Sequence, residues 1–142
     1  MIRAFADANI LVSVLNREYP SFTHTSRILS LKDKARVRIF TSPICIAIAY
    51  YLAEKKQRGT AKHKLKALCQ HMEIAESSRT SVQSAFSNPA AHDLEDGLQY
   101  YAALEAGCNC IVTEDKKDFY FSKIEVLSSQ DFYERYMLRK SA

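Results

Sequence analysis

Short runs of apolar residues alternate along the chain with longer stretches in which apolar residues recur every three or four positions. Runs of the first kind are typical of buried strands, and stretches of the second kind are typical of helices with one buried face. The pattern predicts strands at Ile2–Ala6, 37–40, 73–75, 108–113 and 124–127. It predicts helices at 9–16, 20–34, Pro43–Lys56, 60–72, 78–87 and 93–106, and a last helix from about Ser129. Strands that alternate with helices form parallel sheets, so we expect an α/β fold with three layers, α/β/α, around a short parallel sheet.

Several residues mark where these helices begin and end. Ser42 stands before a proline, which is the usual order of an N-cap and a first helical residue. Pro20 suits the first turn of its helix, and Thr60 and Asp93 are expected to cap theirs. Gly107 follows the helix at 93–106 where a left-handed C-terminal cap is favoured. No strand separates the third helix from the fourth, so we expect these two to form a hairpin.

The composition is that of one soluble domain spanning residues 1–142, with 47% hydrophobic and 25% charged residues. No apolar stretch approaches the roughly 20 residues that cross a bilayer, and no signal peptide is evident at the N-terminus. We therefore expect a cytoplasmic protein with no membrane partner. The four cysteines do not form a disulfide framework in a chain of this kind, and we expect them to be reduced and mostly packed.

A run of basic residues lies in the middle of the chain, within twelve positions. It consists of Lys55, Lys56, Arg58, Lys62, Lys64 and Lys66. Such a run suits a polyanion such as nucleic acid, and a solvated helix face is the alternative. The paired tyrosines at 50–51 and 100–101 lie on predicted helices. Partial burial is the interpretation we favour for them, with base stacking as the alternative.

Carboxylates gather where the predicted strands end. Asp7 directly follows the first strand, Asp115 follows the strand at 108–113, and Asp96 lies in the first turn of a helix. Ligands bind at the carboxyl ends of the strands in open α/β sheets, and clustered carboxylates repel one another unless a cation holds them. The sequence therefore predicts a divalent-metal site with these three aspartates as ligands, and with it phosphoryl chemistry on nucleic acid.

Each of these acids also has a purely local interpretation. Asp7 and Asp93 are well placed as helix N-caps, and Asp96 could be the reciprocal acid of a capping box. Asp115 could serve a turn, although acids are denser there than a turn requires. We assign Asp93 to a cap, place Asp118 beside the metal on the substrate side, and expect Glu114 to point away. The usual nucleotide-binding motifs are excluded, because the chain has no glycine-rich phosphate loop.

Three segments occur in an order that resembles the PIN-domain family, which includes the VapC-type toxins. They are FADANIL at 5–11, DLEDGLQYYAALEAGC at 93–108 and IVTEDKKDF at 111–119, and Val126, Leu127 and Phe132 fit the family's last strand and helix. The resemblance covers essentially the whole chain. It implies a Rossmann-like topology and Mg²⁺- or Mn²⁺-dependent cleavage of RNA by acids at the strand ends.

By position in this resemblance, Asp7 is the first metal-binding acid, Asp96 the third and Asp115 the fourth. Thr113 and Asn9 match polar positions that commonly support the site. VapC-like proteins usually bind a small antitoxin and often dimerise. The resemblance therefore implies an RNA substrate, an antitoxin partner and a homodimer.

The chain departs from the family at one position. The family usually carries a glutamate about a turn and a half into the helix Pro43–Lys56, where this sequence has Ile48. Glu54 is the only carboxylate in that helix and lies on a different face. The missing charge leaves open a second hypothesis, a catalytically degenerate PIN module that binds RNA or a protein partner without cleavage. A phosphoacceptor receiver domain fits less well, because Phe40-Thr41-Ser42 lacks the second aspartate that it needs.

Overall fold

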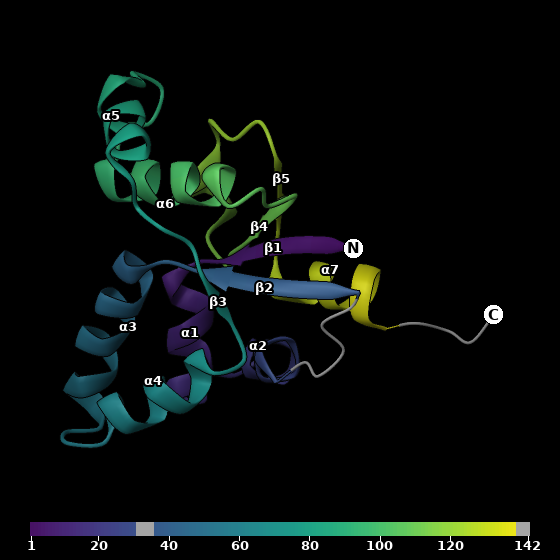
Figure 1. Ribbon diagram of the computed structural model, residues 1–142. Helices are drawn as coiled ribbons and strands as arrows, with labels where there is room; N and C mark the ends of the chain where they lie inside the picture. Colours follow the sequence, from purple (N-terminus) through teal and green to yellow (C-terminus); the bar gives the residue numbers. More distant parts are fainter. Residues whose placement is uncertain (31–35, 139–142) are drawn as a thin grey trace.

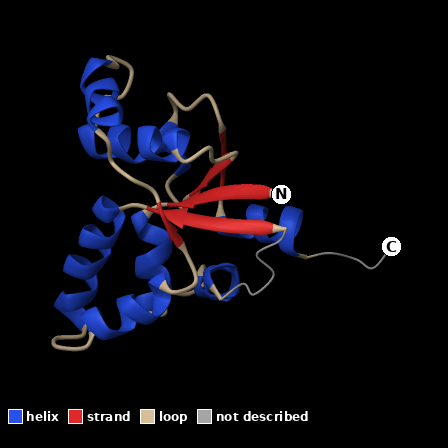
Figure 2. Ribbon diagram, in the orientation of Figure 1, coloured by secondary structure: helices blue, strands red, loops and turns tan. Residues whose placement is uncertain are grey.

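The computed structural model describes residues 1–30 and 36–138, which form one parallel sheet with helices on both faces (Figures 1 and 2). The sheet has five strands: β1 (Ile2–Ala6), β2 (Val37–Thr41), β3 (Glu73–Ile74), β4 (Cys110–Val112) and β5 (Glu125–Leu127). Their order is β3-β2-β1-β4-β5, and every neighbouring pair is parallel. This confirms the predicted three-layer α/β fold.

The helices divide between the two faces of the sheet. They are α1 (Ala8–Leu15), α2 (Phe22–Leu29), α3 (Pro43–Lys56), α4 (Ala61–Cys69), α5 (Arg79–Ser87), α6 (Leu94–Glu105) and α7 (Ser129–Phe132). Figure 1 shows α5 and α6 on one side of the strands and α1 and α2 on the other, with α3 and α4 extending as a hairpin beyond the sheet. A 3-10 turn at Lys116–Phe119 follows β4, and a π-helical turn at Tyr133–Met137 follows α7. None of the helices in the described part of the chain is long and apolar enough to span a membrane.

The strand order places β1 and β4 side by side at the switch point of the sheet, where the direction in which the chain adds strands reverses. From β1 the chain proceeds outwards through β2 to β3, and it then crosses to the other side of β1 to form β4 and β5. In open α/β sheets, ligands bind at such a switch point, outside the carboxyl ends of the strands. The register pairs Ala6 with Val112, so the next residues of the two strands, Asp7 and Thr113, emerge together at this edge.

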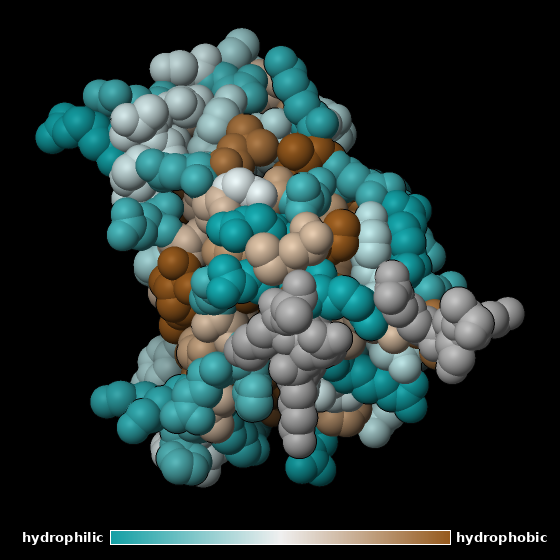
Figure 3. All heavy atoms as spheres, turned by 45° about the vertical axis from the view of Figure 1, so that its right-hand side comes forward, coloured by the Kyte–Doolittle hydropathy of each residue, from teal (hydrophilic) through white to brown (hydrophobic). Residues whose placement is uncertain are grey.

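The core lies between the sheet and its two helical layers. Its largest fully buried side chains include Phe5, Leu11, Ile111, Phe119 and Phe132. Full burial of each such side chain contributes about 1.5–3 kcal/mol, which fixes the strands that carry the polar residues at the sheet edge. The face drawn in Figure 3 is mostly hydrophilic, with apolar side chains in small separate patches.

Most of the predicted helix starts are confirmed by hydrogen bonds at the caps. The Ser42 hydroxyl accepts a bond from the Cys45 amide, and Asp93 accepts bonds from the Glu95 and Asp96 amides. Gly107 has a φ of 74°, the left-handed conformation expected of it. Thr60 is at the N-cap position of α4, as predicted, but its side chain forms no capping bond. Its hydroxyl instead donates to the Gln57 carbonyl at 3.1 Å, and its backbone is already helical.

Several predicted boundaries were wrong. Helix α2 begins at Phe22, because the Ser21 hydroxyl is bonded back to the Glu18 carbonyl in a turn that includes Pro20. It ends at Leu29, and the predicted continuation over 31–34 lies outside the described residues. Helix α4 ends at Cys69 rather than Met72. Strand β4 is shorter than predicted, and Asn109 before it bonds the backbone of Arg3 instead.

Candidate functional site

Asp7 and Thr113 meet at the edge of the sheet between β1 and β4. The Thr113 hydroxyl donates a hydrogen bond of 2.8 Å to Asp7 Oδ2, and Asp7 Oδ1 accepts the Ala8 amide at 2.7 Å as the N-cap of α1. Both side chains are buried. Burial raises the pKa of Asp7 to about 6 although these hydrogen bonds lower it, and the charges of Asp118 and Asp115 add to the rise. Asp7 is therefore both a helix cap and a buried acid at the switch point.

Asn9 connects Asp7's helix to the loop after β4. Its amide nitrogen donates to Thr113 Oγ1 at 3.0 Å and to Asp115 Oδ2 at 3.3 Å, and its amide oxygen accepts the Glu114 amide at 3.2 Å. The Asp115 amide donates to the same Thr113 hydroxyl at 3.1 Å. This network holds the Asp115 carboxylate over the edge of the sheet. Glu114 points away as predicted, because its carboxylate accepts the Ser129 amide at 2.8 Å.

The first turn of α6 brings two more carboxylates towards Asp7. Asp93 is the exposed cap of this helix, and Asp96 lies half-buried one turn inside it. Burial and then the charge of Asp93 raise the pKa of Asp96 to about 7, and the charges of Asp118 and Asp7 contribute to the rise. Asp118, in the 3-10 turn, has a raised pKa from burial and from the charges of Asp115 and Asp93. These shifts show that the acids lie within electrostatic range of one another.

We call this group the acidic cluster; it consists of Asp7, Asp93, Asp96, Asp115 and Asp118. None of the ion pairs between described residues includes a member of the cluster, so its charge is not opposed by a protein cation there. Among residues 1–30 and 36–138, no three histidine, cysteine, aspartate or glutamate side chains are arranged as ligands of one metal ion. The donors fit a hard divalent cation in their chemistry, since they are carboxylates with unopposed charge and raised pKa values.

The position of the expected glutamate is filled by apolar packing. Ile48 is half-buried against the core, and Glu54 lies far along α3, where its carboxylate accepts the Gly59 amide at 2.8 Å. The charge of Asp7 acts on the buried thiol of Cys45 in the first turn of α3, and this thiol donates to Gln99 Oε1 at 3.3 Å. Burial and then the charge of Asp7 raise the pKa of Cys45 to about 12, so it is a neutral thiol.

The hydrogen bond between Cys45 and Gln99 was not predicted from the sequence. Gln99 is fully buried on α6, one turn after Asp96, and it connects α6 to α3 beside the cluster. A glutamine followed by two tyrosines carries no pattern that distinguishes it from an exposed helical residue. Its only signal was its spacing of three residues from Asp96, which places both side chains on one face of the helix.

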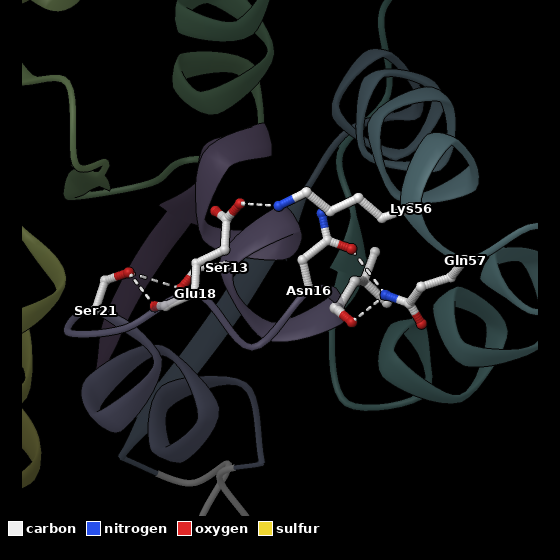
Figure 4. A network of polar contacts seen from close by, with 7 residues as sticks. Ser13, Asn16, Glu18, Ser21, Lys56 and Gln57 are labelled. Atoms are coloured by element: carbon white, nitrogen blue, oxygen red, sulfur yellow. Dashed lines mark hydrogen bonds and ion pairs between the residues drawn. The ribbon is translucent and has the colours of Figure 1, made fainter.

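The basic run lies at the other end of α3 from the cluster. This helix has fourteen residues, and at 1.5 Å per residue it is about 20 Å long. Lys56 forms an ion pair of 3.8 Å with Glu18, beside the bonds from Gln57 to Asn16 and to the end of α1 (Figure 4). Lys55 lies over the ring of Tyr51 at 4.3 Å. The run is therefore not assembled around the acids, and part of it is engaged in joining α3 to α1.

The two tyrosine pairs have different environments. Tyr100 is buried and its hydroxyl accepts the Lys123 amide, and the half-buried Tyr101 accepts the Asn88 side chain. The predicted partial burial is wrong for Tyr50 and Tyr51, which are exposed on α3 because that helix packs mainly through its alanines and Cys45.

The fold and the acids define a class of protein: a doubly wound α/β domain with carboxylates gathered at its switch point. The family model described as PIN domain matches residues 3–117, and the chain belongs to the PIN-domain family. It is 28% identical over 138 residues to "Ribonuclease VapC1" of Aquifex aeolicus (strain VF5), covering 94% of this chain and 95% of that protein.

Solved structures share this fold at low sequence identity. The structure of VapBC2 from Rickettsia felis bound to a DNA fragment from their promoter matches with a TM-score of 0.69 and 18% identity, over 89% of this chain and 98% of that one. Mycobacterium tuberculosis VapC20, a sarcin-ricin loop cleaving toxin, matches with a TM-score of 0.62 and 13% identity, over 76% and 86% of the two chains.

Proposed function

We propose that this PIN-domain protein is a divalent-metal-dependent ribonuclease of the VapC toxin type, which hydrolyses phosphodiester bonds of RNA at the acidic cluster. The observation that carries the proposal is the bonded network of Asp7, Thr113, Asn9 and Asp115 at the switch point, with Asp96 close enough for the acids to raise one another's pKa. The ribonuclease name of the Aquifex relative supports the same reaction.

In this proposal Asp7, Asp96 and Asp115 would hold one Mg²⁺ or Mn²⁺ ion, which would have to draw together side chains that are not arranged as a set of three ligands without it. Carboxylate oxygens are the ligands that these hard cations prefer. When bound, the ion supplies a lowered pKa for a coordinated water and charge stabilisation at the scissile phosphate. The positive charge of the ion would also offset the repulsion among the acids of the cluster. This would explain why none of these acids forms an ion pair with a lysine or arginine of the described residues.

The surrounding residues orient these acids. Each oxygen of Asp7 accepts one bond, from Thr113 and from the Ala8 amide, and Asn9 binds one oxygen of Asp115, so each carboxylate keeps its remaining lone pairs for a ligand. Asp118 lies exposed at the rim, with a pKa raised by burial and by Asp115 and Asp93. A carboxylate with a raised pKa is a better proton acceptor, and Asp118 therefore takes the proton from the attacking water.

The basic run supplies the long-range attraction for RNA. Lys62 and Lys66 of α4 are exposed and form no ion pair with a described residue, so they are free to neutralise phosphates. Replacing both with glutamine should weaken RNA binding. The negative slope of log affinity against log salt should become shallower by about 0.7 for each lost contact with single-stranded RNA. Arg79→Gln, on α5 across the sheet, is the matched control and should leave the slope unchanged.

The resemblance to VapC-type toxins also implies a small antitoxin partner and a homodimer. A shallow apolar groove of about 500 Å³ between α3 and α4, lined by Ile46, Ala47, Tyr50 and Leu65 among others, offers an apolar antitoxin segment a place to bind. Light scattering on the purified chain tests the dimer. Tyr50→Asp should weaken binding of an antitoxin encoded beside this chain. Equal affinity of the variant and the wild type for the antitoxin would place the antitoxin-binding site outside this groove.

The central test is cleavage of a labelled RNA with Mg²⁺ or Mn²⁺, repeated with EDTA. We expect cleavage that the chelator abolishes and that Asp7→Asn with Asp96→Asn removes. Glu105→Gln is the matched control, because Glu105 is exposed at the opposite end of α6 from Asp96. Cleavage that persists in EDTA or in the double variant would disprove the proposal.

The second candidate function is a degenerate PIN module that binds RNA or a protein without cutting it. The apolar packing of Ile48 at the glutamate position favours this candidate, because it removes one negative charge from the metal site. Calorimetry distinguishes the two. Binding of Mn²⁺ at millimolar concentration that Asp96→Asn abolishes supports the nuclease, and the absence of any binding heat supports the degenerate module.

A further inference from the structure

An exposed aromatic pair joins the two segments that carry Asp93 and Asp118. The rings of His92 and Tyr120 lie 5.5 Å apart between centroids, inclined at 55°. His92 belongs to the loop that leads into α6, and Tyr120 directly follows the 3-10 turn after β4. The pair therefore connects segments that are 28 residues apart in the sequence.

The ring of Tyr120 is held in place although it is 57% exposed. Its hydroxyl accepts the His92 amide at 3.3 Å and donates to the Ala90 carbonyl, which fixes it to the loop before α6. Phe121 meets the ring edge-on at 5.5 Å, and Phe121 in turn packs against the buried Tyr100 at 5.1 Å. An exposed aromatic ring that is fixed from beneath loses little conformational freedom when a ligand covers it.

The place of this pair relative to the acids suggests what covers it. His92 immediately precedes Asp93, and Tyr120 lies two residues after Asp118; these two acids interact, since the charge of Asp93 raises the pKa of Asp118. The pair thus stands at the rim of the acidic cluster. A strand of RNA with one phosphate at the cluster must place a neighbouring base near that rim, where its backbone meets Asp93 and Asp118, the two acids that are not proposed metal ligands.

We propose that His92 and Tyr120 form a stacking platform for a nucleobase of single-stranded RNA that flanks the phosphate at the acidic cluster. This inference rests on the proposed nuclease function. Every base has a π-face, so the platform orients the strand without selecting its sequence. Stacking of this base compensates for the repulsion between the RNA backbone and the carboxylates of Asp93 and Asp118, and it places the neighbouring phosphodiester at the cluster.

The test uses a single-stranded RNA oligonucleotide in which 2-aminopurine, whose fluorescence falls when it stacks, replaces each base in turn. Binding is measured with Mg²⁺ in an Asp118→Asn background, which removes the proposed proton acceptor and retains the three proposed metal ligands. One labelled position should be quenched on binding. Tyr120→Leu should relieve that quenching and weaken binding about tenfold, the effect expected for the loss of one base–aromatic stack. Tyr120→Phe, which retains the ring but loses the hydroxyl's bonds to His92 and Ala90, should keep the quenching and lose less affinity than Tyr120→Leu.

Tyr19→Leu is the matched control, because Tyr19 is also an exposed tyrosine, at 72%, and lies beyond the far end of α1 from the cluster. His92→Leu, on the other side of the pair, repeats the test if Tyr120→Leu unfolds. Quenching that survives both leucine variants, or a parent protein that binds no RNA, would overturn the platform. The fluorescence assay measures binding and stacking, whereas the cleavage assay measures the nuclease. A wild-type protein that binds and stacks RNA but does not cut it would therefore disprove the nuclease and leave the platform supported.

Discussion

Thr113 Oγ1 donates a hydrogen bond of 2.8 Å to Asp7 Oδ2 across 106 positions of sequence, and both residues are buried at the switch point of the sheet. The same hydroxyl accepts bonds from Asn9 and from the Asp115 amide. The Thr113 side chain thereby fixes the distance between Asp7, which follows β1, and the loop that follows β4.

Replacing Thr113 with valine should raise the pKa of Asp7 above about 6, because the bond that stabilises its charged form is lost while its burial remains. At pH 8 the unfolding free energy should fall by about 1.5–3 kcal/mol, the usual contribution of a hydrogen bond to a charged group. Carboxyl NMR titration measures the pKa and urea unfolding the stability. Thr113→Ser retains the hydroxyl and should stay near wild type; a valine variant with an unchanged Asp7 titration would contradict this account.

Stability should decrease as pH rises from about 4 to 7. Burial raises the pKa of Asp7 to about 6 and that of Asp96 to about 7, from 3.8 in both cases. The folded state therefore binds more protons than the unfolded state in this window, and the unfolding free energy falls with pH until both acids are ionised. Asp96 is half-exposed and contributes less than its shift suggests.

Asp7→Asn should flatten this dependence and stabilise the protein at pH 8 by at most about 3 kcal/mol, since the pKa rises from 3.8 to about 6 and each unit corresponds to about 1.4 kcal/mol. Asparagine is also a favoured N-cap, so α1 keeps its start. Urea unfolding in EDTA between pH 4.5 and 8 measures the effect. Glu105→Gln should keep the wild-type slope, and a wild-type protein with no slope in this range would rule out the raised pKa values.

Ile48→Glu should tighten Mn²⁺ binding by adding a carboxylate beside the cluster. Ile48 lies three residues after Cys45 on α3, hence on the same side of the helix, and Asp7's charge already acts on Cys45. The Mn²⁺ concentration at half-saturation should fall severalfold, measured by calorimetry. Ile48→Gln has nearly the same shape without the charge, so equal affinity of the two variants would show that this position does not face the metal.

Cys69 should be the first cysteine to react with iodoacetamide in the native protein at pH 8. Cys45, Cys108 and Cys110 are buried, with pKa values raised to about 12 by burial, whereas Cys69 is only half-buried on α4, although burial raises its pKa as well. Mass spectrometry should find one modification, which Cys69→Ser removes. Early modification of any other cysteine would contradict the packing described for it.

Local signals in the sequence predicted most of the elements and several of their ends. Ser42 and Asp93 cap their helices as expected, because an N-cap depends only on a side chain and the two or three amides that follow it. Thr60 occupies the predicted N-cap position, but its hydroxyl donates to the Gln57 carbonyl instead of accepting from an amide of α4, and residue type alone does not choose between these two partners.

Hydrophobic periodicity and strand-end polarity are local properties, and they were enough to predict an α/β domain with acids after its first and fourth strands. The position of β1 beside β4, the bond from Thr113 to Asp7 and the contact of His92 with Tyr120 depend instead on how distant segments pack. Strand order follows from which distant surfaces bury the most apolar area together. That choice brings the acids into electrostatic contact and raises the pKa of Asp7, a consequence that no single segment carries.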